Sequence, residues 1–337
     1  MKLVVTGGAG FIGSAFVRYA LGRHADVQVT TLDCLTYAGN LANLEAVRAD
    51  SRHRFVRGDV ADSAAVDGVL AEGADAVVHF AAESHVDRSI SDASPFLRTN
   101  VIGTGVMLEA ARRHGVARFV HVSTDEVYGS LAPHERADEQ APLRPTSPYA
   151  ASKAASDLLV LAYGRTHGID VVVTRCSNNF GPFQFPEKMI PLFITNALVD
   201  EPVPLYGDGG NVRDWIFVDD HCTALDRVLR RGRAGEVYNI GAANEWTNRD
   251  LTREILARLG KSSDLVRPVA DRPAHDRRYA LDCSKLRGEI GWQPEHAFAD
   301  ALERTIDWYR SHEPWWRTVK TGEYRRFYDL WYGERLQ

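Results

Sequence analysis

The strongest constraint on the fold is a glycine-rich turn between the first apolar run and the first helical pattern. Residues 2–6 lead into Thr6-Gly7-Gly8-Ala9-Gly10-Phe11-Ile12-Gly13, and a helical segment follows at once. Gly8, Gly10 and Gly13 have the spacing G-x-G-x-x-G. Such glycines permit a tight turn and a close approach of a pyrophosphate to a helix N-terminus, where free N–H groups face the anion. The turn therefore predicts a dinucleotide site.

Strand-like and helix-like segments alternate through the first half of the chain. Strand patterns cover residues 2–6, 27–33, 54–57, 76–81, 119–123 and 170–176, and helix-length segments include 12–21, 100–114 and 149–166. This alternation predicts an α/β fold with a Rossmann-like, doubly wound parallel sheet. We expect residues 1–177 to form a cofactor-binding lobe, to whose sheet residues 236–241 return. Residues 178–337 should form mainly a smaller, mixed α/β substrate-binding lobe.

Composition narrows the possible functions of these 337 residues. A formal charge of −5 argues against general binding of nucleic acids or anionic membranes. The chain has neither a signal-peptide pattern nor a membrane-spanning apolar run, so we expect a soluble, cytoplasmic protein. Its four cysteines are scattered and indicate neither a disulfide framework nor a metal site. No metal is expected.

An acidic residue indicates which dinucleotide binds. Asp33 ends the second predicted strand about 20 residues after the glycine turn, the spacing expected of a carboxylate that binds the adenosine ribose. It would repel a 2′-phosphate, and the next three residues, Cys34, Leu35 and Thr36, include no arginine. NAD is therefore predicted rather than NADP. Asp59 and Val60, after the third strand, are candidates for contact with the adenine.

Two further motifs carry the candidate chemistry. Tyr149 and Lys153 are four residues apart on one predicted helix face, so the ammonium can lower the pKa of the phenol and prepare it to accept a hydroxyl proton. Asp125 and Glu126 lie at the carboxyl end of the fifth strand, where a substrate binds in folds of this kind. Together with the dinucleotide site, these motifs predict redox chemistry on a sugar or alcohol.

With these motifs the chain resembles the extended short-chain dehydrogenase/reductase family, and within it the nucleoside-diphosphate-glucose 4,6-dehydratases. The Asp125-Glu126 pair is the specific element, because related 4-epimerases and decarboxylases share the cofactor and Tyr/Lys motifs but generally lack this pair. The resemblance covers almost the whole chain, with further motifs at residues 32–40, 81–89, 124–129, 177–184, 186–191, 213–215, 238–241 and 275–279.

The resemblance implies an NAD-dependent hydro-lyase that converts dTDP-glucose to its 4-keto-6-deoxy product and water. Tyr149 accepts the 4-hydroxyl proton while hydride passes to NAD, and Thr124 binds the same oxygen. Glu126 removes the hydrogen on carbon 5, and Asp125 protonates the departing 6-hydroxyl. Hydride then returns to carbon 6 and a proton to carbon 5, so NAD is tightly bound and regenerated. These roles require a protonated Asp125 beside an ionised Glu126.

The resemblance completes the two sets of binding residues. The cofactor set is Gly7, Gly10, Phe11, Ile12, Gly13, Asp33, Cys34, Leu35, Thr36, Asp59, Val60, Phe80, Ala81, Ala82, Ser84, Thr99, Tyr149, Lys153 and Asn179. The substrate set is Ser84, Thr124, Asn178, Lys188, Met189, Pro204, Leu205, Tyr206, Arg213, Asn248, Asp271, Arg272, Pro273, Ala274 and His275. A homodimer is also implied, through a four-helix bundle that uses residues 100–114 and 149–166.

Three alternatives stay open. UDP-glucose or another nucleoside-diphosphate glucose could replace dTDP-glucose, because Phe180, Phe183 and residues 242–243 depart from the family pattern. A nucleotide-sugar 4-epimerase would return hydride to carbon 4, and the acidic pair counts against it. A binding protein without turnover would have no use for the intact set of Thr124, Asp125, Glu126, Tyr149 and Lys153.

Overall fold

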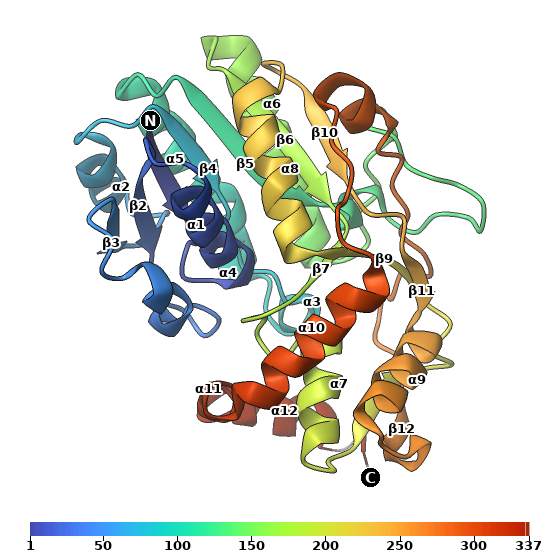
Figure 1. Cartoon of the computed structure of the whole chain (residues 1–337). Coiled ribbons are helices and arrows are strands. Elements are labelled where there is room, and N and C mark those ends of the chain that lie inside the picture. The colour runs from blue at the N-terminus through green and yellow to red at the C-terminus, as the bar shows by residue number, and fades with distance from the viewer. Residues whose placement is uncertain (334, 337) are drawn as a thin grey trace.

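The computed structural model describes residues 1–333, 335 and 336, and a seven-stranded parallel sheet organises most of the first half of the chain (Figure 1). The order of its strands is β10-β6-β5-β4-β1-β2-β3. Their bounds are β1 (Lys2–Thr6), β2 (Gln28–Asp33), β3 (His53–Arg57), β4 (Ala76–His79), β5 (Arg118–Thr124), β6 (Val171–Cys176) and β10 (Val237–Ile240). The predicted α/β class and doubly wound sheet are confirmed.

Helices cover both faces of this sheet, as near-continuous apolar strands require. One face packs against α1 (Phe11–Arg23), η1 (Leu41–Val47) and α8 (Val218–Arg231), and the other against α2 (Ser63–Leu70), α5 (Thr104–Arg113) and α6 (Pro148–His167). Helix α6 begins where Ser147 accepts a hydrogen bond from the Ala150 amide (3.1 Å), and it ends at Gly168, whose φ is +70°.

The chain after β6 builds a second group of elements. A three-stranded sheet contains β7 (Asn178–Phe180), β9 (Val212–Phe217) and β11 (Glu245–Thr247), and β8 (Val203–Tyr206) pairs with β12 (Val266–Val269). Around them lie α7 (Met189–Leu198), α9 (Asn248–Leu259), α10 (Phe298–Ser311), α11 (Glu313–Val319) and α12 (Glu323–Tyr332), in the lower part of Figure 1. The aromatic C-terminal residues Tyr309, Trp316 and Tyr332 belong to the core of this group.

Short helical segments join the main elements: α3 (Val86–Ser91), α4 (Ser94–Phe96), η2 (Leu97–Gly103), η3 (Asp125–Tyr128), η4 (Ser263–Leu265) and η5 (Leu286–Ile290). The helix predicted from residue 100 therefore begins earlier, and η2 is π-helical. The strand predicted over residues 76–81 ends at His79. Within the described chain, no helix is both long and apolar enough to span a membrane.

Candidate active site

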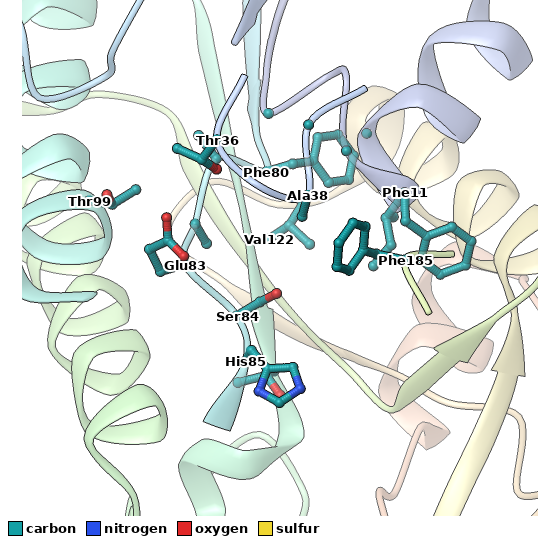
Figure 2. A pocket seen from close by; sticks show the side chains of 18 of the residues that line it. Phe11, Thr36, Ala38, Phe80, Glu83, Ser84, His85, Thr99, Val122 and Phe185 are labelled. Atoms are coloured by element: carbon teal, nitrogen blue, oxygen red, sulfur yellow. The ribbon is translucent and has the colours of Figure 1, made fainter. Parts of the chain in front are cut away.

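The largest group of candidate residues lines one cavity at the carboxyl ends of the parallel strands (Figure 2). In that view Phe11 and Phe185 lie on one side, and Glu83 and Thr99 lie on the other. Every predicted catalytic residue lines the cavity, as does every predicted cofactor residue except Leu35. The side chain of Leu35 packs against the core beside β1 and α1 instead.

The glycine turn has the close backbone packing that its sequence predicts. Gly7 has a φ of +66°, and a Cβ at this residue would lie 2.7 Å from the Ala81 amide nitrogen. A Cβ at Gly13 would lie 2.3 Å from the Gly7 carbonyl oxygen. These positions exclude side chains, so the N-terminal end of α1 stays open to an anionic group.

Asp33 is held rigidly at the cavity wall. Its Oδ2 atom accepts a hydrogen bond from the Ala9 amide (2.9 Å), and its Oδ1 atom accepts one from the Leu35 amide (2.8 Å). Each carboxylate oxygen keeps a lone pair for a ribose hydroxyl. Asn178 Oδ1 is buried and has no hydrogen-bond partner in the described part of the chain; together with the glycine turn, this arrangement fits NAD.

The acidic pair begins a single helical turn, η3, directly after β5. Thr124 caps it: the Glu126 amide donates to Thr124 Oγ1 (3.3 Å), which in turn donates to Asp125 Oδ1 (3.3 Å). Asp125 is buried, and its Oδ2 atom has no partner among the described residues. An unpaired buried carboxylate is costly, so this side chain favours its protonated form.

Burial and the Glu126 charge raise the pKa of Asp125 well above its usual value. Burial also raises the pKa of Glu126, but the charges of Arg272, Lys188 and Arg213 oppose that rise. The side chain of Glu126 is only partly buried. Burial therefore favours the protonated form of both carboxyl groups, and the three cations oppose this effect at Glu126. The ionised Glu126 that the sequence-based hypothesis requires stays a prediction.

Tyr149 and Lys153 occupy the same buried face of α6. Lys153 Nζ donates to the Val122 carbonyl oxygen (2.9 Å), and burial lowers the pKa of this ammonium to about 8. Burial, with the Glu126 charge, raises the pKa of the Tyr149 phenol well above its usual value. The sequence predicts a lowered pKa for Tyr149; in the protein alone, burial outweighs any lowering by Lys153.

The predicted substrate residues divide between the cavity and its surroundings. Ser84, Thr124, Asn178 and Lys188 line the cavity, and Lys188 Nζ donates to the Ser84 carbonyl oxygen (2.6 Å). The remaining predicted substrate residues do not line the cavity: Met189, Pro204, Leu205, Tyr206, Arg213, Asn248, Asp271, Arg272, Pro273, Ala274 and His275. Arg213 and Arg272 still lie close enough for their charges to act on Glu126.

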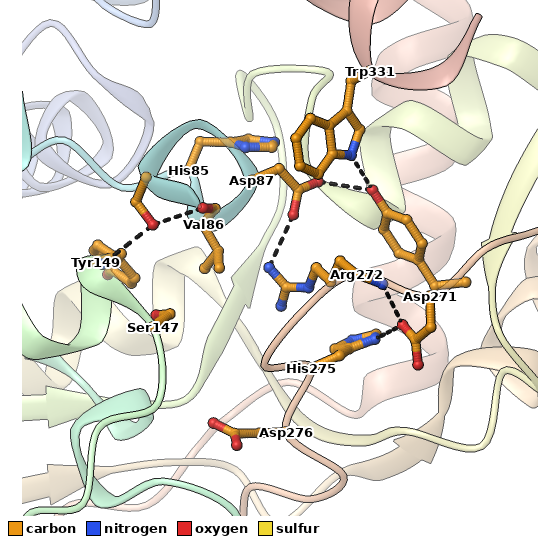
Figure 3. Close-up of polar contacts among 12 residues, drawn as sticks. His85, Val86, Asp87, Ser147, Tyr149, Asp271, Arg272, His275, Asp276 and Trp331 are labelled. Atoms are coloured by element: carbon orange, nitrogen blue, oxygen red, sulfur yellow. Dashed lines mark hydrogen bonds and ion pairs between the residues drawn. The ribbon is translucent and has the colours of Figure 1, made fainter. Parts of the chain in front are cut away.

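A polar cluster beside the cavity joins segments from both halves of the chain (Figure 3). Arg272 Nη1 donates to Asp87 Oδ1 (3.0 Å), and the Tyr206 hydroxyl donates to Asp87 Oδ2 (2.8 Å). Trp331 of the last helix donates from Nε1 to the Tyr206 hydroxyl oxygen (2.6 Å). The hydroxyl end of Tyr206, a predicted substrate residue, is thus fixed by α3 and α12.

Several cavity residues are absent from the sequence-based sets. Some stand inside the motifs that carry the resemblance, and their place in those motifs is the signal that could have found them: Tyr37, Ala38, Gly39, Glu83, His85, Ser177, Gln184 and Glu187. Others, such as Val122 and Phe185, have no distinguishing local pattern. Only the fold brings them to the cavity.

Comparisons with known proteins agree with this geometry. The family described as GDP-mannose 4,6 dehydratase matches residues 4–305. The chain is 59% identical over 325 residues to a dTDP-glucose 4,6-dehydratase of Streptomyces antibioticus, a match that covers 95% of this chain and 96% of that protein.

Solved structures include relatives with two different activities. A dTDP-glucose 4,6-dehydratase of Streptomyces venezuelae with NAD and dTDP bound has a TM-score of 0.93 and 56% identity, covering 95% of this chain and 100% of that one. A UDP-glucose 4-epimerase of Thermus thermophilus in complex with NAD has a TM-score of 0.86 and 34% identity, covering 93% and 100%. The fold alone therefore does not separate dehydration from epimerisation.

Proposed function

Because the chain belongs to the GDP-mannose 4,6 dehydratase family, within the extended short-chain dehydrogenases/reductases, we propose that it is an NAD-dependent dTDP-glucose 4,6-dehydratase. It converts dTDP-glucose to dTDP-4-keto-6-deoxyglucose and water. The observation that carries the proposal is the acidic pair, Asp125 and Glu126, in one cavity with Tyr149 and Lys153. An oxidation and an elimination on one sugar require both pairs of groups.

NAD is the cofactor, and the glycine turn and Asp33 are the residues that would hold its pyrophosphate and adenosine ribose. When bound, it supplies a hydride acceptor for carbon 4 of the sugar and a hydride donor for carbon 6. The chain's own groups move the protons.

Tyr149 is the base for the 4-hydroxyl group, and the neighbouring Thr124 hydroxyl binds the same sugar oxygen. Burial makes the phenolate costly, so Tyr149 gives up its proton only when positive charge lies close by. Lys153, on the same helix face, supplies one such charge below a pH of about 8. These two residues prepare the oxidation of carbon 4.

The acidic pair carries out the elimination of water. Oxidation of carbon 4 acidifies the hydrogen on carbon 5, which Glu126 removes as a base because nearby cations favour its ionised form. Asp125 keeps its proton through burial and donates it to the departing 6-hydroxyl group. We assign the substrate's diphosphate to the cations around Glu126, namely Lys188, Arg213 and Arg272.

Mass spectrometry tests this reaction directly. We expect the purified protein, incubated with dTDP-glucose and no added reductant, to yield a sugar nucleotide that has lost one water. A parallel incubation with UDP-glucose measures the base preference, and we expect slower turnover. An unchanged mass with a new stereoisomer would establish 4-epimerisation and overturn the proposal.

We also propose that the protein is a cytoplasmic homodimer whose subunits pair through the helices around α6. Large apolar side chains are exposed on η2 and α6, which pack against each other: Leu97 (54%), Ile102 (58%) and Leu158 (59%). Exposed apolar side chains on packed helices are typical of a protein interface, and a second copy would cover them.

A further inference from the structure

A buried ion pair lies behind the catalytic residues, and the reaction does not use it directly. Arg175 Nε, from β6, donates to Asp157 Oδ2 of α6 (2.9 Å), and both side chains are almost completely buried. Asp157 follows Lys153 by four residues, as Lys153 follows Tyr149, so all three lie on one face of the helix. Arg175 is thereby fixed to the helix that carries the oxidation machinery.

The same arginine also reaches the acidic turn. Its Nη1 atom donates to the Tyr128 hydroxyl oxygen (2.9 Å), and that hydroxyl donates to Asn239 Oδ1 of β10 (2.8 Å). Tyr128 is the last residue of η3, which begins with Asp125 and Glu126. One guanidinium therefore connects α6 to the turn that carries the elimination machinery.

The position of Arg175 in the sheet makes this connection unusual. It pairs in register with Ser123 of β5 and Asn239 of β10, and it shares its sheet face with the apolar Val171 and Val173. A buried charge costs stability unless it is fully paired. The sheet itself gives no reason for an arginine at this position.

We propose that Arg175 is a positioning residue that, through Asp157 and Tyr128, holds the acidic turn and α6 in one fixed geometry. The inference rests on the proposed dehydration, in which two elements must act on neighbouring carbons of one sugar ring. A displacement of about 1 Å between reacting groups can lower a rate by about 100-fold. The ion pair keeps the elimination groups aligned with the sugar that Tyr149 has helped to oxidise.

The variant Tyr128→Phe tests the connection, because it removes one hydroxyl and keeps the ring. We expect elimination to slow by roughly 10- to 100-fold while KM and the rate of oxidation stay near those of the wild type. Reduced cofactor should then accumulate on the enzyme after mixing with dTDP-glucose, visible by its near-ultraviolet absorbance. Arg175→Lys keeps the charge but loses the guanidinium that bonds Asp157 and Tyr128 at the same time. We expect reduced cofactor to accumulate in this variant too.

Tyr238→Phe is the matched control. Tyr238 is a buried tyrosine of β10 whose hydroxyl makes two hydrogen bonds, to the Arg233 amide and to Glu289, away from the catalytic elements. We expect the Tyr238→Phe enzyme to turn over dTDP-glucose without accumulating reduced cofactor. If Tyr128→Phe behaves like this control, or slows oxidation and elimination equally, the inference is wrong. Failure of the wild type to release water would instead overturn the proposed function. Tyr128→Phe decides the question even if Arg175→Lys does not fold.

Discussion

At the scale of single residues, Asp125 and Glu126 differ in their surroundings although they are neighbours in the chain. Asp125 is buried and has one oxygen without a partner among the residues described, and the charge of Arg213 opposes the rise of its pKa, whereas three cationic side chains act on Glu126. The first environment favours the carboxylic acid, whereas the cations of the second oppose the effect of burial on Glu126. The proposed acid and the proposed base thus differ in environment rather than in residue type.

Replacement of the acid should separate the two stages of the reaction. We expect Asp125→Asn to lower kcat for dehydration by about 100-fold or more, because the 6-hydroxyl then leaves without a proton donor. Stopped-flow absorbance should show reduced cofactor persisting, since Tyr149 and Lys153 remain. Glu72→Gln, at a surface ion pair with Arg54, is the control. Full dehydration by Asp125→Asn would show that Asp125 is not the acid.

The pKa of Lys153 predicts an alkaline limb in the pH profile. Its folded-state pKa is lowered to about 8, so the cationic form is present below that pH and is lost as the pH rises through it. We therefore expect kcat/KM to fall above a pH of about 8. In Lys153→Arg the limb should move to higher pH, because a guanidinium stays charged. An unmoved limb would assign it to another group.

At the scale of elements, the close packing of the glycine turn can be tested by substitution, and the control position lies in the same helix. Gly13→Ala puts a Cβ against the Gly7 carbonyl, so we expect a loss of stability of about 1–3 kcal/mol and little NAD retained on purification. Gly22, also in α1, has nothing within 4 Å of an added Cβ. Gly22→Ala should raise stability by about 0.5–1 kcal/mol and keep the cofactor. Thermal unfolding and cofactor content after denaturation check both variants.

Local patterns predict most of the main sheet, because buried parallel strands and capped helices leave short-range signals in the sequence. The strands β1 and β2 and the helix α6 follow such signals closely. The polar layer inside the sheet leaves no such short-range signal. A histidine or arginine in an apolar strand has a partner that only the tertiary fold supplies. His79, His121 and Arg175 were missed for this reason. The division into two lobes stays a prediction.

The candidate site divides in the same way. The glycine turn and Asp33 lie at the ends of neighbouring strands, so motif spacing predicts them, whereas the resemblance is needed for the rest of the cofactor set. The residues around Tyr206 come from distant segments, and its contact with Trp331 joins positions 125 residues apart. No local pattern encodes such a contact, and its partners could not be predicted from the sequence.

At the scale of the whole molecule, the exposed apolar side chains of η2 and α6 make the oligomeric state testable. We expect light scattering to give the mass of a dimer for the wild type and of a monomer for Leu158→Glu, because a buried, unpaired carboxylate opposes association. Leu330→Glu, on α12 and 78% exposed, should remain dimeric. A wild-type monomer would contradict the proposed pairing.

The last helix of the chain also bears on how the protein is made. Glu323 pairs with Arg88 (2.9 Å), and Trp331 donates to the tyrosine that bonds Asp87, so α12 is joined beside the cavity to the early helix α3. Synthesis proceeds from the N-terminus, and the cofactor-binding strands emerge from the ribosome long before these partners do. A nascent chain can therefore assemble its dinucleotide site before α12 completes the polar cluster around Tyr206.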